Sequence, residues 1–127
     1  MKVLIITNNP AVHIEYCNAE TVDFQEDADQ EAILRRARDR IHLGSVLVMH
    51  PMMGRIKPHE TPYKSVLLTE GGGETDLTSV QIIEESIAET SKFLGAGFRK
   101  KYDDSLLPDL QLIDLWLLKS GIEEYRR

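Results

Sequence analysis

Short runs of apolar residues predict the strands of a buried sheet. Residues 3–6, 45–49 and 65–69 are largely continuous in Val, Leu, Ile and Met, a pattern typical of strands that are covered on both faces. Residues 21–25 instead alternate polar and apolar side chains, which favours a half-exposed strand at a sheet edge. The hydrophobic pattern therefore predicts four strands.

Capping residues predict two helices in the first third of the chain. Asn9-Pro10 should begin a helix over residues 10–17, because Asn favours the N-cap and Pro the first helical position. Asp27 and Gln30 have the spacing of a capping box, and they predict a second helix. That helix should end at Gly44, because glycine is favoured directly after a helix.

Two more helices are expected near the C-terminus, at residues 78–95 and 108–120. The second of these should stop at Gly121. It is apolar nearly all round, with Leu, Ile or Trp at most positions. A helix of this kind is either deeply buried or partly used against another subunit. A homodimer contact through residues 108–120 is therefore one expectation.

The order of the elements predicts one α/β domain over residues 1–127. We expect a three-layer, Rossmann-like fold, with a mainly parallel four-stranded sheet of order 2-1-3-4 and helices on both faces. The direction of strand 4 stays open, because the 50–64 loop shows no crossover helix and strand 4 could pair antiparallel with strand 3. In open sheets of this type, ligands bind where the strand order reverses, here beyond strands 1 and 3.

The composition excludes several classes of protein. With 42% hydrophobic and 28% charged residues, the chain is expected to fold as a soluble globular domain. A net charge of -6 argues against broad nucleic-acid binding. Cys17 is the only cysteine, and no Cys/His spacing is typical of a metal site. No apolar run is long enough for a membrane span or a signal peptide, so we expect a cytoplasmic protein without cofactor, metal or membrane contact.

Residues 50–64 form a long polar loop between two apolar runs. The loop contains three of the five prolines and two of the four histidines of the chain. It contains the cations Arg55, Lys57 and Lys64 and the single carboxylate Glu60, which gives a local charge of about +2 in an acidic protein. Such clusters bind phosphate or carboxylate groups, so the loop predicts a site for a small anionic or zwitterionic molecule.

The candidate residues come from two loops that the predicted sheet brings together. Asn8 and Asn9 lie beside a helix N-terminus, which attracts anions, although capping alone could explain either residue. His50 directly follows an apolar strand and is the best candidate for an acid or base. For the lysines, the ordinary alternative is solvated surface charge. The candidate ligand-binding residues are Asn8, Asn9, His50, Arg55, Lys57, Glu60, Thr61, Tyr63 and Lys64.

The same loops carry a resemblance to a known family. Five segments resemble the GrdX family, small proteins encoded beside the glycine, sarcosine and betaine reductases of amino-acid-fermenting anaerobes: Thr7-Asn8-Asn9-Pro10, His50-Pro51, Gly54, Lys57-Pro58 and Glu60-Thr61-Pro62-Tyr63-Lys64-Ser65. The resemblance implies a setting, the reductive cleavage of glycine or N-methylated glycines in the cytoplasm. It assigns no catalytic role to any residue.

Three functions follow as hypotheses. The leading one is a non-enzymatic accessory protein of glycine, sarcosine or betaine reductase metabolism, which binds a small ligand or a reductase subunit through the two loops. The second is a small enzyme acting on a phosphorylated or carboxylated metabolite, with His50 as acid/base and Lys57 or Lys64 as anion anchor. The third is a structural interaction protein that uses its last helix. No nucleophile elbow or phosphate-binding loop is present, so no catalytic residue is assigned.

Overall fold

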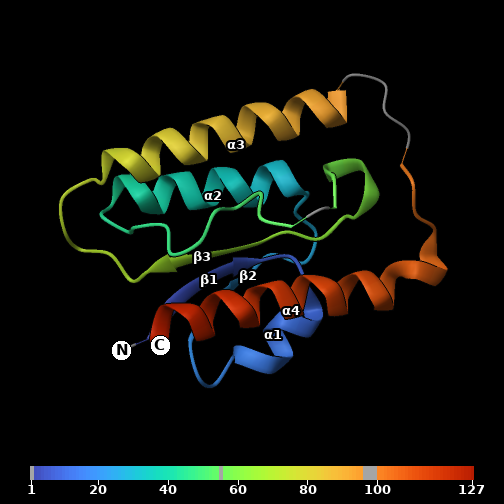
Figure 1. Ribbon diagram of the computed structural model, residues 1–127, viewed down its shortest axis with the longest axis horizontal. Helices are drawn as coiled ribbons and strands as arrows, with labels where there is room; N and C mark the ends of the chain where they lie inside the picture. The colour runs from blue at the N-terminus through green and yellow to red at the C-terminus, as the bar shows by residue number, and fades with distance from the viewer. Residues whose placement is uncertain (1, 55, 96–99) are drawn as a thin grey trace.

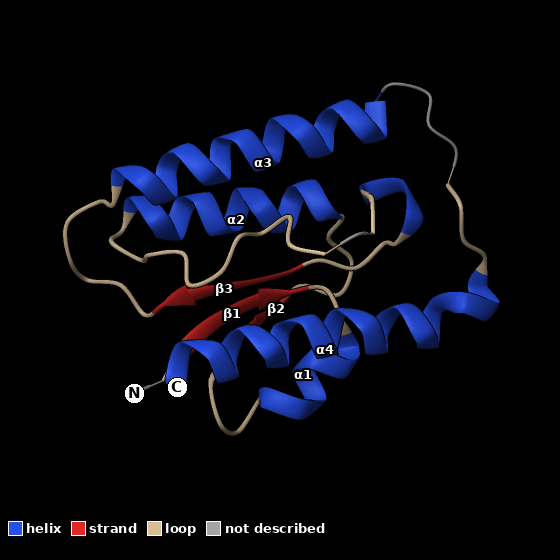
Figure 2. Ribbon diagram, in the orientation of Figure 1, coloured by secondary structure: helices blue, strands red, loops and turns tan. Residues whose placement is uncertain are grey.

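A mixed sheet forms the centre of the molecule. The computed structural model describes residues 2–54, 56–95 and 100–127. In this part of the chain the sheet has three strands in the order β2-β1-β3 (Figures 1 and 2). The strands are β1 (Val3–Thr7), β2 (Thr21–Phe24) and β3 (Ser65–Thr69). β1 pairs parallel with β2 and antiparallel with β3.

Helices cover both faces of this sheet. Helices α2 and α3 lie on one face, and helices α1 and α4 lie on the other (Figure 1). Their bounds, with those of two short 3-10 turns, are α1 (Pro10–Tyr16), α2 (Gln30–His42), η1 (Pro58–Glu60), α3 (Leu77–Gly95), η2 (Asp104–Leu106) and α4 (Leu107–Arg126). The structure thus confirms the α/β class with helices on both faces.

Alternation along β1 divides the core in two. Leu4 and Ile6 face α2 and α3, in a cluster with Ile33, Ile83 and other buried side chains. Val3 and Ile5 point the other way, against α1 and α4. All five residues of β1 are buried, because the strand is central and has helices above and below. As predicted, residues 3–6 are continuously apolar because both faces of the strand are covered.

The predicted strand order is wrong at one place. Residues 65–69, expected to be separated from β1 by another strand, pair directly with β1. Residues 45–49, expected next to β1, contribute only an isolated antiparallel bridge between Leu47 and Leu68. The sheet is therefore mixed and three-stranded rather than mainly parallel and four-stranded, and the reversal between parallel strands 1 and 3 does not exist.

The lack of a crossover helix in the described part of the connection between these segments explains the antiparallel direction. A parallel return would need a crossover of a dozen or more residues, usually a helix, and the described part of the 50–64 loop forms only the turn η1. Residues 46–48 lie along β3: the N–H of Val48 donates to the carbonyl of Leu67, and the N–H of Thr69 donates to the carbonyl of Val46, both at 2.9 Å. The N–H of Leu47 does not bond β3 but donates to the hydroxyl of Ser79, at 3.0 Å, at the start of α3. The antiparallel alternative for residues 65–69 is thus the one that the structure adopts.

Two predicted helix starts shift by a few residues. α1 begins as predicted, with Asn9 as N-cap and Pro10 as first residue. The N-cap of α2 is Asp29 rather than Asp27, and its side chain accepts from the N–H of Ala32 at 2.8 Å. For α3, Asp76 accepts from the N–H of Ser79 at 3.0 Å. Acidic side chains therefore cap both helices, as the helix dipole favours.

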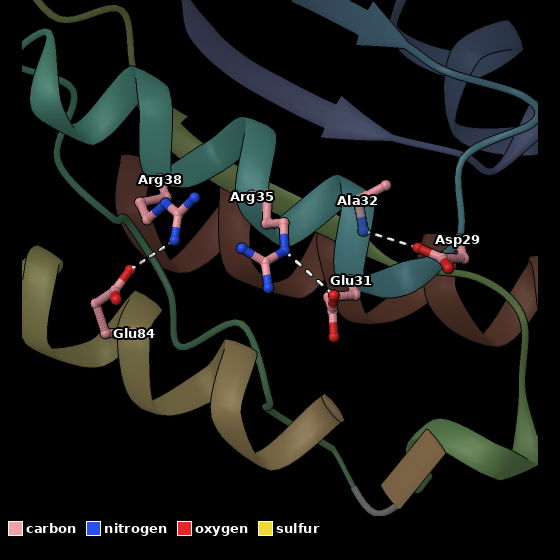
Figure 3. Close-up of polar contacts among 6 residues, drawn as sticks. All are labelled: Asp29, Glu31, Ala32, Arg35, Arg38 and Glu84. Carbon is pink, nitrogen blue, oxygen red and sulfur yellow. Dashed lines mark hydrogen bonds and ion pairs between the residues drawn. The ribbon is translucent and has the colours of Figure 1, made fainter. Parts of the chain in front are cut away.

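Exposed ion pairs occur within α2 and between α2 and α3 (Figure 3). Arg35 pairs with Glu31 one turn earlier at 3.2 Å, and Arg38 reaches Glu84 of α3 at 3.3 Å. Such pairs contribute little individually. They show that Arg35 and Arg38 reach the solvent side of α2.

The prediction that Gly121 ends the last helix is wrong, because α4 continues to Arg126. A side chain at Gly121 would meet the sulfur of Met49, so this glycine allows the 45–49 segment to pack closely against α4. Only one side of α4 is buried: Leu112, Ile113 and Trp116 are 47%, 40% and 64% exposed. A homodimer through this helix stays a prediction. None of the described helices is long and apolar enough to cross a membrane.

Gly44 ends α2 as predicted, and its replacement by Ala should destabilise the fold. The N–H groups of Gly44 and Ser45 donate to the carbonyls of Ile41 and Arg40, both at 3.0 Å, in a Schellman motif. Gly44 has φ +103°, and a Cβ atom there would lie 2.7 Å from the backbone nitrogen of Gly73. We expect Gly44→Ala to lower the free energy of unfolding by about 1–3 kcal/mol, measured by urea denaturation.

Gly95→Ala is the matched control. Gly95 is the last residue of α3, and a Cβ atom there would have open space around it. This variant should be as stable as the wild type or slightly more stable. Equal stability of both variants would contradict the role given to Gly44.

Candidate functional site

The two loops that were predicted to form a site do meet, but by a different route. β3 runs antiparallel to β1 and places Ser65 opposite Thr7. The end of the 50–64 loop therefore lies beside the start of the Thr7–Pro10 segment. The loop reaches this place through the start of β3, and not through a neighbouring strand at residues 45–49.

Asn8 joins the two loops by hydrogen bonds from its side chain. Its Nδ2 donates to the carbonyl oxygens of Ala28 and Pro62, at 2.8 and 2.9 Å, and its Oδ1 accepts from the N–H of Lys64 at 2.9 Å. The residue is only 5% exposed. A buried amide that bonds three backbone groups holds segments together, so Asn8 positions the loop. Its predicted ligand role remains untested.

A buried chain of hydrogen bonds links Asn9 to α4. The N–H of Asn9 donates to Thr7 Oγ1 at 3.0 Å, and Thr7 Oγ1 lies 2.7 Å from Ser65 Oγ. The Ser65 hydroxyl donates to Asp114 Oδ2 of α4 at 2.6 Å, and Asn9 Nδ2 donates to the same oxygen at 3.0 Å. Donors from both loops therefore converge on one carboxyl group.

Beside this chain lies a pocket between residues 49–65 and α4, here named the loop–helix pocket. Its cavity volume is about 40 Å³, room for a few water-sized groups. Its apolar walls are Met49, Pro51, Met53, Ile56, Leu110, Ile113, Leu117 and Leu118. Its polar lining residues are His50, Thr61, Tyr63, Lys64, Ser65 and Asp114. Few polar groups on apolar walls are typical of small-molecule sites.

Two opposite charges lie in the lining of this pocket. Burial lowers the pKa of Lys64, although the charge of Asp114 opposes this shift. Burial also raises the pKa of Asp114, against hydrogen bonds from Ser65 and Asn9 and the charge of Lys64. Among the ion pairs between described residues, none links Lys64 directly to Asp114. Both groups are thus poorly hydrated and influence each other without direct contact.

The 50–64 loop holds Lys64 and His50 in place with its own backbone. Lys64 Nζ donates to the carbonyl oxygen of Pro51 at 2.7 Å and lies 3.9 Å from Met52 Sδ. His50 Nδ1 accepts from the N–H of Met52 at 3.1 Å. In the neutral imidazole the proton is then on Nε2, which could exchange it with a ligand. Of the charged and titratable candidates, these two reach the pocket.

Tyr63 and Thr61 also line the pocket, where they separate it from a second one. The hydroxyl of Tyr63 accepts from Gln111 Nε2 of α4 at 2.8 Å. Thr61 Oγ1 accepts from the N–H of Tyr63 at 3.2 Å, while the carbonyl of Thr61 accepts from the side chain of Gln30. These bonds fix the segment that forms the wall between the two pockets.

Two candidates, Lys57 and Glu60, lie away from the loop–helix pocket. Lys57 is exposed, with its Nζ 5.8 Å from the centre of the Phe93 ring. Glu60 accepts from the N–H of Lys57 at 2.8 Å and caps η1. His59, the other histidine of the loop, is buried and stacks on Phe93. The candidate Arg55 lies outside the described residues. Of the two described cations of the loop, Lys64 therefore lines the pocket and Lys57 does not.

The second pocket is larger and acidic. It has a cavity volume of about 470 Å³ and lies between the start of α2, the 58–63 segment and residues 100–107. Among the described lining residues, the carboxylates are Glu26, Asp27, Asp29 and Asp104, and the only cation is Lys100. Asn8 lines this pocket rather than the first. Because like charges repel, an anionic ligand is better suited to the loop–helix pocket. No metal-binding group of His, Cys, Asp or Glu occurs among the described residues.

Asp114 is the main residue of the pocket that sequence reasoning missed. It lies in the C-terminal part of the chain, far from both loops, and so escaped an argument based on the loops. One signal was present: Asp114 is the only charged residue between Asp109 and Lys119, in an otherwise apolar stretch. A lone carboxylate there is rarely buried without a partner. Ser65 and Gln111 carried no comparable signal.

Comparison with known proteins gives one match. The sequence model of a family described as GrdX-like protein covers residues 4–123. The match confirms the resemblance found in the two loops and extends it through α4. No curated protein matches the chain, and no solved structure matches it either.

Replacing Asp114 by Asn should stabilise the protein at neutral pH. Because burial raises the pKa of Asp114 above its ordinary value of 3.8, the folded state keeps a proton that the unfolded chain has already released. This contribution to stability is complete at low pH and is lost as the pH rises through the folded-state pKa. Urea denaturation from pH 4 to pH 8 should show the free energy of unfolding of the variant rising relative to that of the wild type. The rise should be about 1.4 kcal/mol for each unit by which folding raises the pKa of Asp114.

Asp109→Asn is the control, because Asp109 is exposed in the first turn of the same helix. Its carboxylate favours the helix dipole, so this variant should equal the wild type or be slightly less stable at neutral pH. A stability difference for Asp114→Asn that does not change with pH would contradict the burial argument.

Proposed function

The chain belongs to the GrdX-like protein family, and we propose that it is an accessory protein of glycine, sarcosine or betaine reductase metabolism that binds a small zwitterionic or anionic metabolite. The proposed site is the loop–helix pocket. The observation that carries the proposal is the presence of two half-buried, opposite charges, Lys64 and Asp114, in the lining of one small cavity without a direct ion pair. A zwitterion presents a carboxylate for the ammonium group and an ammonium for the carboxylate.

The surroundings of the two charges support a ligand of this type. Ser65 and Asn9 hold Asp114 in position from one side, and Pro51 holds the Lys64 ammonium from the other. A ligand therefore meets charges whose positions are already fixed, which reduces the entropy lost on binding. The apolar walls suit methyl groups, and the small cavity excludes long side chains.

The setting of reductase metabolism also supports a second role, the binding of a partner protein. A reductase subunit could bind over the exposed residues at the mouth of the pocket, where Met53 and Ile113 are 53% and 40% exposed. In this arrangement the partner would deliver or receive the ligand. The ligand-binding half of the proposal does not depend on it.

Calorimetric titration tests the proposal. Glycine, sarcosine, betaine and acetate should be compared, and we expect at least one of them to bind the wild-type protein. Lys64→Met should weaken that binding about ten- to a hundredfold, because hydrogen bonds to charged groups contribute about 1.5–3 kcal/mol. Lys92→Met is the control, since Lys92 is exposed in the last turn of α3. Absence of heat with every compound, together with unchanged melting temperatures, would refute the proposal.

A second candidate function rests on His50, which lines the same pocket as Lys64. His50 could act as acid or base on a small phosphorylated or carboxylated metabolite held by the lysine. With acetyl phosphate as probe, this candidate predicts phosphate release that His50→Ala abolishes while the melting temperature stays the same. Release that survives the substitution, or no release by the wild type, would eliminate it.

A further inference from the structure

Lys64 differs from the other lysines of the chain in its surroundings. Lys2, Lys57, Lys92, Lys100 and Lys101 are exposed. Lys119 pairs with Glu15 at 3.2 Å. Lys64 instead lies in the lining of the loop–helix pocket, and its partner there is a neutral carbonyl, that of Pro51 at 2.7 Å.

These surroundings make the neutral amine of Lys64 more populated than that of an exposed lysine. An ammonium group that loses water and gains no direct carboxylate partner is less stable than in solution. In agreement, burial lowers the pKa of Lys64. The neutral amine has a free electron pair and is the form that attacks carbonyl carbons. The geometry therefore provides a nucleophile at the wall of a cavity.

The same cavity is lined by a group that can donate a proton. Asp114 is half-buried, and the hydrogen bonds from Ser65 and Asn9 both engage its Oδ2 atom. This leaves Oδ1 to carry and transfer a proton. Burial raises the pKa of Asp114, which keeps the carboxyl protonated to higher pH than an exposed one. A nucleophilic amine and a weak acid thus line one pocket of about 40 Å³.

We propose that the Lys64 amine forms an imine with a small aldehyde or 2-oxo acid inside the loop–helix pocket. The amine nitrogen attacks the carbonyl carbon, a C–N bond forms, and the electron pair of the C=O bond moves to oxygen. A proton passes from nitrogen to oxygen to give a carbinolamine. Asp114 then protonates the hydroxyl group, which leaves as water, and a protonated imine remains beside the Asp114 carboxylate. The step needs no oxidant or reductant.

The size of the cavity limits the carbonyl compound. A volume of about 40 Å³ holds a few water-sized groups, so compounds of two or three carbons fit and aromatic aldehydes do not. Exposed lysines have no such limit. Selectivity for small carbonyl compounds is therefore a property of Lys64 alone.

Reductive trapping on the full chain tests the proposal. The protein is incubated at pH 7 with a limiting amount of glyoxylate or acetaldehyde and cyanoborohydride, then digested, and each lysine is quantified by mass spectrometry. We expect Lys64 to be modified faster than Lys92, by about tenfold for each unit by which its pKa is lowered, because the fraction of neutral amine rises in that proportion. Benzaldehyde should remove this preference, and Asp114→Asn should slow modification of Lys64 while leaving Lys92 unchanged.

The outcomes separate this proposal from the proposed function, whose pocket it shares. Modification of Lys64 no faster than that of Lys92 would overturn the imine proposal. An unchanged rate in Asp114→Asn would overturn the role of Asp114 as acid. Because the comparison among lysines is made within one wild-type molecule, it does not depend on a variant folding. Glycine, sarcosine and betaine contain no aldehyde or ketone, so their binding can succeed or fail independently of the trapping result.

Discussion

The antiparallel pairing of β3 with β1 is the constraint on which the site depends. This register places Ser65 opposite Thr7 and brings their hydroxyl oxygens to 2.7 Å. The loop before β3 and the loop after β1 then leave the sheet at the same end. Every contact between the two loops, including those of Asn8 with Pro62 and Lys64, follows from this arrangement.

A long loop can be rigid when its backbone is bonded by buried side chains. Asn8 bonds the backbone at Pro62 and Lys64, and Gln30 donates to the carbonyl of Pro58 at 3.2 Å. Backbone groups that leave water need such partners. These amides come from β1–α1 and α2, so the regular part of the fold determines the course of the loop. As a result, the loop can hold Lys64 in one position against α4.

Sequence patterns predicted local elements well and the order of the sheet poorly. Asn9-Pro10, Gly44 and the apolar runs other than residues 45–49 are local signals, and their elements occur close to where they were expected. The neighbour of β1 depends instead on which apolar run pairs with it, and residues 45–49 and 65–69 have nearly the same pattern. For the site, Lys64 and His50 were predicted from the loop. Asp114 was not, because its role depends on how α4 packs on the sheet.

The half-buried charges of the loop–helix pocket are better explained by function than by stability. Removing a charge from water costs free energy that a direct ion pair only sometimes recovers. Lys64 and Asp114 have no direct pair between them, whereas Glu20 and Arg126 elsewhere in the molecule pair at 2.6 Å. The fold thus forms a close ion pair where α4 ends near β1, and it leaves two charges apart where a cavity lies. Two charges held apart do not optimise stability. Between two loops and a helix, they are what a binding or reactive site requires.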